Sequence, residues 1–587
     1  METPSLMRLA TVQVPTAEQL DTVNGLDEST VNAIWAHFVP IKTGVLNKQD
    51  VQEYLSFYFR TLWHFKPVIP RHYRDRSKDV LLIDREPLLT ITLLVLASRW
   101  HPLAGPHGEI RSERIHWQLW KYLQTYLNTV LWGSNCTRSL GTIASLLLVI
   151  EWHSKATNNL SQLCEDLEDG VTRRPRAGLR GIEQTTKLPS AGQHSYEAAS
   201  ALERLNILSA AHRSSKMSWT LLSVAISLAH EGRCFENPLQ HKSSACSETE
   251  KAEQEWTKLL CVFLFMADEN LALRLGREPL LSESARQTVM TRLSASFASC
   301  LDDSFIWEST LELYIEHRKA RQSIQALATG RPGSEYESPN VLPTLEHIQR
   351  NLARWRRRHK TGIEGSSSTL HHLLDIEYRY SLLYSFSPAL AFWRHHEANR
   401  HPQDQATGGN AHLYSQFAHV TKQASQELLS IVVYSLEPLN LLRYAPVRFW
   451  AYIIPTSLYL IKASLILPTR PGEILENTKL LHALVGAAKR SSPDDLHISV
   501  SFSQSLEALL RVTLDLCPDD SSTGLPQTGQ QSGNTIPSSS SLGEDENANL
   551  LMFNQFQALE RMDFGSFDFL GNSEAWFAAS DLIWPES

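Results

Sequence analysis

The sequence predicts an all-α protein, built as one large multi-helix body with loops and a tail of disordered composition. Apolar residues recur with the helical period over most of the chain, whereas alternating strand patterns and Asn-Gly or Asp-Gly hairpins are scarce. Hydrophobic residues make up 42% of the 587 residues and charged residues 20%, which is typical of a globular chain. A chain of this length can enclose a large core.

The charge and the cysteines exclude several classes of protein. The net charge of −8 argues against a main surface that binds nucleic acid by neutralising phosphates. The seven Cys are scattered, and no two of them form a Cys-x-x-Cys pair. This pattern predicts reduced thiols, with neither a disulfide framework nor a zinc site, and we expect no cofactor.

Changes in composition divide the chain into four parts. Residues 1–46 form an N-terminal segment without the basic and apolar regions of a signal peptide. Residues 47–515 carry the helical pattern and are interrupted by a long polar loop, rich in Gly and Pro, at 165–212. A Ser-, Gly- and Gln-rich linker of disordered composition follows at 516–543, and an acidic tail occupies 544–587.

The most apolar stretches are EPLLTITLLVLASRW, GTIASLLLVIEW and LLCVFLFMA. Each is shorter than the ~20 residues that a membrane-spanning helix needs. They predict buried core helices, and we expect no membrane segment.

The stretch MSWTLLSVAISLAHEGRCF at 217–235 predicts a helix of about four turns, buried over most of its circumference. Its polar residues recur at helical spacing and form one narrow stripe: Thr220, Ser223, Ser227 and His230. Trp219 is expected on the buried side. Gly232 follows the last periodic residue, in the position of a C-terminal cap.

No motif of an enzyme is present. The chain lacks G-x-S-x-G, the P-loop and G-x-G-x-x-G. In HHEANRH at 395–401, His401 follows His396 by five residues, so the two would not share a helical face, and we expect a solvated helix end. In LDDSFIWE, Asp302 and Asp303 lack the third acid of a magnesium-binding helix and predict a helix N-terminus.

A basic run, RWRRRHK at 354–360, is expected to end a helix with Ile348, Leu352 and Trp355 on its apolar stripe. Cations are favourable at a helix C-terminus, which gives the run a structural explanation. The alternative is a nuclear-import signal made of Arg354, Arg356, Arg357, Arg358 and Lys360. A second cluster, RRPR at 173–176, lies in the predicted loop.

The tail combines nine acidic residues and one Arg with large aromatic side chains. Acidic and hydrophobic residues alternate in this way in activation segments, where the acids keep aromatics solvated until a partner's groove accepts them. The candidate activating residues are Phe564, Phe567, Phe569, Trp576, Phe577 and Trp584. The alternative is a terminal helix that docks on the chain's own body.

Five stretches, in their order, resemble the middle homology region of fungal zinc-cluster transcription factors. They are YLSFYFRTLWHFKPVIP (54–70), EPLLTITLLVLASRW (86–100), SWTLLSVAISLAHEGRCF (218–235), DENLALRLGREP (268–279) and LDIEYRYSLLYSFSPAL (374–390). Each motif is degenerate, and their order makes the set moderately specific. The likeness extends over roughly residues 47–470.

The resemblance implies an all-α regulatory body and structural roles for its motif residues. The matched positions are Trp219, Ala225, Gly232, Asp268, Gly276, Arg277 and Pro279. Gly276 can adopt a positive φ to close a helix. Asp268 follows an apolar run and needs a partner if it is buried, for which Arg274 and Arg277 are the nearest candidates.

The chain also departs from this family. Cys261 and Val262 stand where aromatic residues are usual, Glu269 replaces a common base, and Glu278 separates Gly-Arg from Pro. Nothing before residue 50 supplies the six cysteines, the basic stretch or the coiled-coil heptads of the family's DNA-binding module. Either the chain lacks that module, or the sequence begins downstream of it.

We therefore expect a non-enzymatic fungal regulator of transcription in the nucleus that controls a metabolic or secondary-metabolite gene set. Its tail would bind a coactivator or a mediator-type protein. A DNA-binding partner, a homodimer and a small-molecule effector are further expected partners, and direct DNA binding is in doubt. The alternatives are a co-regulator without DNA contact and, more distantly, an all-α enzyme with an apolar pocket.

Overall fold

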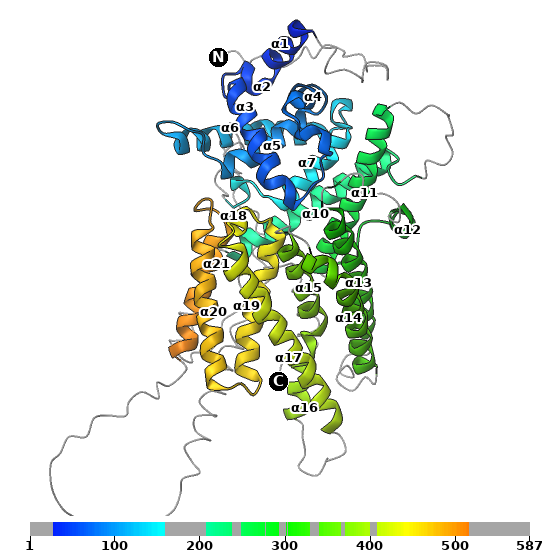
Figure 1. Ribbon diagram of the computed structural model, residues 1–587, viewed down its shortest axis with the longest axis vertical. Helices are drawn as coiled ribbons and strands as arrows, with labels where there is room; N and C mark the ends of the chain where they lie inside the picture. Colours follow the sequence, from blue (N-terminus) through cyan, green and yellow to red (C-terminus); the bar gives the residue numbers. More distant parts are fainter. Residues whose placement is uncertain are drawn as a thin grey trace, which may run out of the picture. The chain divides into compact units, whose positions relative to one another are not determined.

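The computed structural model (Figure 1) describes residues 27–158, 207–236, 248–275, 277–292, 301, 303–328, 340–365, 370–398 and 408–515. All regular structure in these ranges is helical, which confirms the all-α prediction. The linker, the acidic tail, the RRPR cluster, Gly276 and Asp302 lie outside the described residues, so what the sequence predicts for them stays a prediction.

The chain is divided into two compact units, where the sequence predicts one body over 47–515. Unit 1 comprises Met1–Ser154, Thr220–Asp268 and Pro279–Leu311, and unit 2 comprises Lys155–Trp219, Glu269–Glu278 and Glu312–Ser587. Three helices contribute residues to both units: α10 (Ile207–Glu231), α11 (Glu248–Leu275) and α13 (Ser304–Ala328). Because these helices are continuous across the division, helical periodicity does not reveal it. The helix α10 also begins inside the loop predicted at 165–212.

Unit 1 is organised around one short, buried helix that is rich in apolar residues. Its other helices are α1 (Glu28–His37), α2 (Val39–Lys42), α3 (Lys48–Phe57), α4 (Asp79–Arg85), α6 (Gly108–Leu131), α7 (Leu140–Glu151) and α12 (Glu283–Arg292). The central helix α5 (Pro87–Trp100) packs against α3, α4, α6 and α7. Every residue of α5 after Pro87 is buried, as is every residue of α7 from Gly141 onward. The apolar windows therefore form core helices, as predicted.

Unit 2 is a set of longer helices, several of which lie side by side (Figure 1). They are α14 (Val341–Gly365), α15 (His371–Phe386), α16 (Pro388–Ala398), α17 (Gly408–Ile431), α18 (Leu441–Tyr444), α19 (Val447–Ile466), α20 (Pro471–Arg490) and α21 (Ile498–Asp515). The helix α17 packs against α15, α16, α19 and α20 and is the centre of this unit.

The helix α19 is long and apolar enough to cross a membrane by length and composition, which no other helix of the described residues is. Within unit 2, however, 72% of its apolar window is buried. Two of its buried hydroxyls form hydrogen bonds inside the helix: Thr456 donates to the carbonyl of Tyr452 and Ser457 to that of Ile454. This burial is that of a core helix.

The part of α10 after Trp219 places its polar stripe outward, as predicted. Thr220, Ser227 and His230 are exposed, whereas Leu222 and Ala225 are fully buried. Trp219 is only half-buried, so its expected place in the core is wrong. Its ring lies 5.3 Å from the guanidinium carbon of Arg277. Gly232 follows the helix, but the left-handed residue there is Arg233, with φ of 54°.

Candidate functional site

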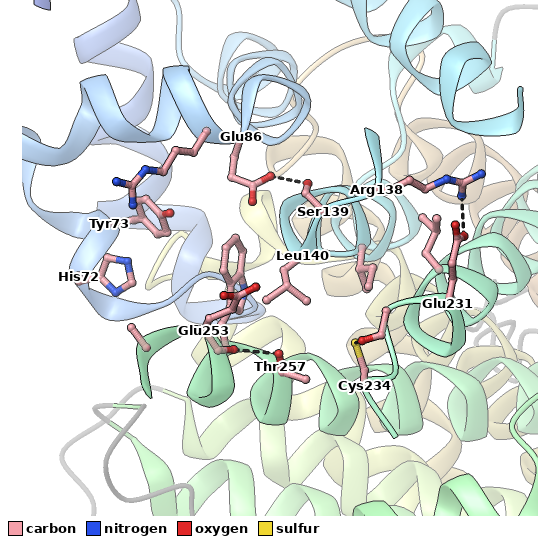
Figure 2. Close-up of a pocket in the computed structure, with 16 residues that line it drawn as sticks. His72, Tyr73, Glu86, Arg138, Ser139, Leu140, Glu231, Cys234, Glu253 and Thr257 are labelled. Atoms are coloured by element: carbon pink, nitrogen blue, oxygen red, sulfur yellow. Dashed lines mark hydrogen bonds and ion pairs between the residues drawn. The ribbon is translucent and has the colours of Figure 1, made fainter. Parts of the chain in front are cut away.

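A cavity of about 530 Å³ lies within unit 1 and is the candidate functional site (Figure 2). Five separate stretches of the chain line it, and they include His72, Glu86, Ser139, Gly232 and Trp256. The cavity lies where α4 meets α5, beside the N-terminus of α7, the C-terminal end of α10 and the first half of α11. Charged, aromatic and aliphatic side chains all contribute to its walls.

Glu86 is the buried acid of this cavity. Its carboxylate accepts a hydrogen bond of 2.6 Å from the hydroxyl of Ser139 and another from the backbone N–H of Gly141. It thus caps the N-terminus of α7, where free N–H groups and the helix dipole favour an anion. Gly141 is required there by space, because a Cβ at that position would collide with the Glu86 carboxyl group.

Burial raises the pKa of Glu86 to about 7. The hydrogen bonds from Ser139 and Gly141 oppose this rise, and the charge of Glu253 across the cavity adds to it. Near neutral pH the two forms of Glu86 therefore have similar populations. Small changes in the charge inside the cavity will move a proton on or off this carboxyl group.

An aromatic wall lies beside the two acids. The rings of Tyr73 and Trp256 meet edge to face with 5.8 Å between their centres. The indole N–H of Trp256 donates to the carbonyl of Val68 at 2.8 Å, which fixes the orientation of that ring. Burial, followed by the charge of Glu86, raises the pKa of Tyr73 to about 12, so its phenol stays protonated at neutral pH.

The basic residues at the cavity differ in how far their charge is compensated. Arg138 forms an ion pair of 3.2 Å with Glu231 (Figure 2). Burial and the nearby cations Lys78 and Arg85 lower the pKa of His72, which keeps this imidazole neutral at pH 7. Arg85 is exposed and lies at the same cavity.

The described residues contain no group of three His, Cys, Asp or Glu side chains that could hold a metal ion. Cys234 lines the cavity with a buried thiol that is in no disulfide. The chemistry that the walls offer is recognition through charge, hydrogen bonds and aromatic surface.

The motif residue Asp268 lies elsewhere in unit 1 and is fully buried. Its two carboxylate oxygens accept hydrogen bonds from the backbone N–H groups of Leu280 at 2.7 Å and Leu281 at 2.8 Å. The arginines expected as its partners have other contacts. Arg274 donates to the side chain of Asn270 at 3.4 Å, and Arg277 lies over a tryptophan. The half-buried Pro279 immediately precedes the two amides that Asp268 binds.

Unit 2 contains a buried polar network that the sequence analysis did not identify. Glu377 on α15 pairs with Arg448 on α19 at 3.3 Å, and both side chains are less than a tenth exposed. Tyr314 on α13 donates to the same carboxylate at 3.3 Å, and Asn270 on α11 donates to the Tyr314 hydroxyl at 3.1 Å. The network joins residues of four helices, and it does so within unit 2.

The basic run at 354–360 lies inside α14, which continues to Gly365, so the predicted helix end at this run is wrong. Arg356 forms an ion pair of 2.5 Å with Asp375 and Arg358 one of 2.8 Å with Glu312. Arg354, Arg357 and Lys360 are exposed. The segments HHEANRH and LDDSFIWE lie at helix boundaries, as the sequence predicts. The helix α16 ends at Ala398, and α13 begins directly after Asp303.

Comparisons with known proteins give one informative match. No family model matches the chain, and no solved structure matches it. The chain is similar to the transcription factor hmgR of Aspergillus fumigatus, with 22% identity over 488 residues, which cover 80% of this chain. The match spans 62% of the relative's length, which is less than two thirds. The similarity is distant, and the matched relative is a transcription factor.

Proposed function

We propose that the chain is a fungal transcriptional regulator whose helical units carry regulation and whose acidic tail carries activation. The observation that supports this most is the similarity to a fungal transcription factor over 80% of the chain. The resemblance of five stretches, in their order, to the middle homology region points to the same class of protein. The nucleus is the proposed location, and a metabolic or secondary-metabolite gene set is the proposed target.

The tail is the segment that we propose activates transcription. Its aromatic residues would enter a shallow apolar groove of a coactivator, while its acids raise the encounter rate and keep the segment solvated. The linker at 516–543 is rich in residues that make a flexible tether, which would let the tail search for this partner.

The test is a reporter assay with the full chain fused to an unrelated DNA-binding domain. We expect activation, and we expect it to be lost when residues 544–587 are removed. The joint replacement of Phe564, Phe567, Phe569 and Trp576 by Ala keeps every acid and should abolish activation. The control changes Asp563 and Asp568 to Asn, keeps every aromatic, and should weaken activation only partly.

The outcomes separate the competing interpretations. If the aromatic-free chain activates as well as the native one, the groove mechanism is wrong. If neither form activates but the chain recruits a DNA-binding protein to its promoters, a co-regulator without DNA contact is the better description. If the fusion lowers reporter output, the chain is a repressor.

A further inference from the structure

We propose that the cavity of unit 1 binds a small organic cation, an ammonium group on an apolar body, with Glu86 and Glu253 as its counter-charges. This inference concerns a site and a ligand class. It does not rest on a role in transcription, because binding is measured on the protein itself.

The two acids lie at one cavity, and within the described residues neither has a cation as its partner. Glu86 is held by Ser139 and Gly141, which are neutral donors. Glu253 is exposed at the cavity wall, and its carboxylate has no hydrogen bond or ion pair within the part of the chain that the structure describes. When both carboxylates are ionised, their negative charges repel each other. An ammonium group between them would relieve that repulsion.

The aromatic wall favours the same ligand class. Figure 2 shows Tyr73, Glu86, Leu140 and Glu253 around one space. Trp256 and Tyr73 present aromatic surface to it, and an ammonium group over such a ring gains a cation–π interaction. Leu140 supplies an apolar contact for the ligand's body. The volume of about 530 Å³ falls within the ~300–1,000 Å³ typical of small-molecule pockets.

The cavity's own cations compete only weakly for the acids. Arg138 is already neutralised by Glu231 at 3.2 Å. His72 is neutral at pH 7, because burial and two nearby cations lower its pKa. Among the described residues, Arg85 is the cation of the lining for which no ion pair is found, and it is exposed to water, where its charge is screened.

The protonation state of Glu86 should control the affinity of the cavity for the organic cation. The groups that face Glu86 are Ser139 and Gly141 from α7, Glu253 from α11 and Tyr73 from the turn before α4, with Arg85 beside it. Burial raises the pKa of Glu86 to about 7, so this carboxyl group titrates near neutrality. A bound cation stabilises its ionised form, so affinity should rise with pH between 6 and 8 and binding should release protons.

The experiment is calorimetric titration of the full chain with three probes of one shape. They are 2-phenylethylammonium, 3-phenylpropionate and 3-phenylpropan-1-ol, each at constant ionic strength and at pH 6, 7 and 8. We expect the cation to bind best, and more tightly at pH 8 than at pH 6. E86Q and E253Q should each weaken its binding about tenfold, the scale of one charge-assisted contact. E86Q should also remove the pH dependence.

Control variants distinguish a specific loss of cation binding from misfolding. D84N changes an exposed acid outside the cavity lining, and R85Q removes the exposed arginine of the lining; both should retain cation binding. Ala252→Trp should fill the cavity and block all three probes. Circular dichroism and thermal melting must show that each variant is folded.

Two results would overturn the proposal. One is tighter binding of 3-phenylpropionate that is lost in R85Q, which would make this an anion site. The other is absence of cation binding, or cation binding that E86Q and E253Q leave intact in folded protein. Failure of the reporter assay would leave this result unaffected, so the two proposals can fail separately.

Discussion

The carboxylate oxygen Oδ2 of Asp268 lies 2.8 Å from the backbone nitrogen of Leu281, and its other oxygen lies 2.7 Å from that of Leu280. A fully buried charge is thus satisfied by two main-chain amides that lie 12 and 13 residues further along the chain. Hydrogen bonds to an ionised acceptor are stronger than neutral ones. This side chain therefore fixes the path of the segment that follows Pro279.

Asp268→Ala should destabilise unit 1 by about 3 kcal/mol, because two buried N–H groups lose a charged acceptor. The isosteric Asp268→Asn should destabilise as well, since it turns one acceptor into a donor that faces a backbone N–H. Urea unfolding followed by tryptophan fluorescence measures both. The exposed Asp84→Asn is the control and should stay within about 0.5 kcal/mol of wild type. An unchanged midpoint for Asp268→Asn would contradict the assignment.

The pair of Glu377 and Arg448 should show strong coupling. Replacing either residue alone by Met leaves the other charge buried without its partner. This should lower the free energy of unfolding by about 3–5 kcal/mol. Replacing both by Met should cost clearly less than the sum, because no charge is left without its partner. A double-mutant cycle by urea unfolding gives the coupling energy. If the two single effects on the free energy of unfolding add up, the residues do not stabilise unit 2 as a coupled pair.

Within α10, Leu222→Ala should be more destabilising than Trp219→Ala, although tryptophan is the larger side chain. Leu222 is fully buried, and its truncation should cost about 2–5 kcal/mol. Trp219 is half-buried, and its cation–π contact with Arg277 adds only about 0.5–1 kcal/mol at an exposed site. Thermal melts of the two variants test the order. The reverse order would place Trp219 in the core after all.

The ionisation of Glu86 should make the protein less stable as pH rises from the ordinary carboxyl pKa of 4.5 to about 7. The folded state holds this proton more tightly than the unfolded state, so stability falls with pH in that window and is level above it. Glu86→Gln keeps the acceptor for Ser139 and removes the titration. The difference in melting temperature between variant and wild type should therefore change between pH 4.5 and 7. A constant difference would mean that Glu86 does not titrate there.

Asp79 serves as the comparison for this experiment. Burial also raises its pKa to about 7, and it lies outside the cavity lining. Asp79→Asn should alter the same pH window of stability. It should leave binding of the ammonium probe and its pH dependence unchanged.

The sequence predicted the core helices α5 and α7 of unit 1 well, because apolar residues dominate both helices and such helices are buried. It also predicted that Asp268 needs a partner, but not which one. The amides of Leu280 and Leu281 contact the Asp268 carboxylate only because of the path that the loop takes. The local sequence pattern does not predict that path. The predicted helix end at 354–360 was wrong for a related reason: α14 packs against α15 and α17, and this packing outweighs the weak helix propensity of Gly362.

The cavity could not be predicted as a site. Glu86 stands at the head of an apolar window that the sequence analysis singled out, and a charged residue in front of a buried helix was the one available signal. Its partner Ser139 lies 53 residues further on, and Glu253 comes from a different helix. Walls assembled from five stretches become visible only once the chain is folded.

The division of the chain into two interleaved units limits how such a protein can change over evolutionary time. Each unit is built from three separate stretches of sequence, and α10, α11 and α13 each belong to both. No single cut in the gene can release one unit or graft it onto another protein. A duplication or fusion that moves a contiguous stretch carries fragments of both units. The two must be inherited together, and any new specificity has to arise by substitution within them, while terminal segments such as the tail remain free to be exchanged.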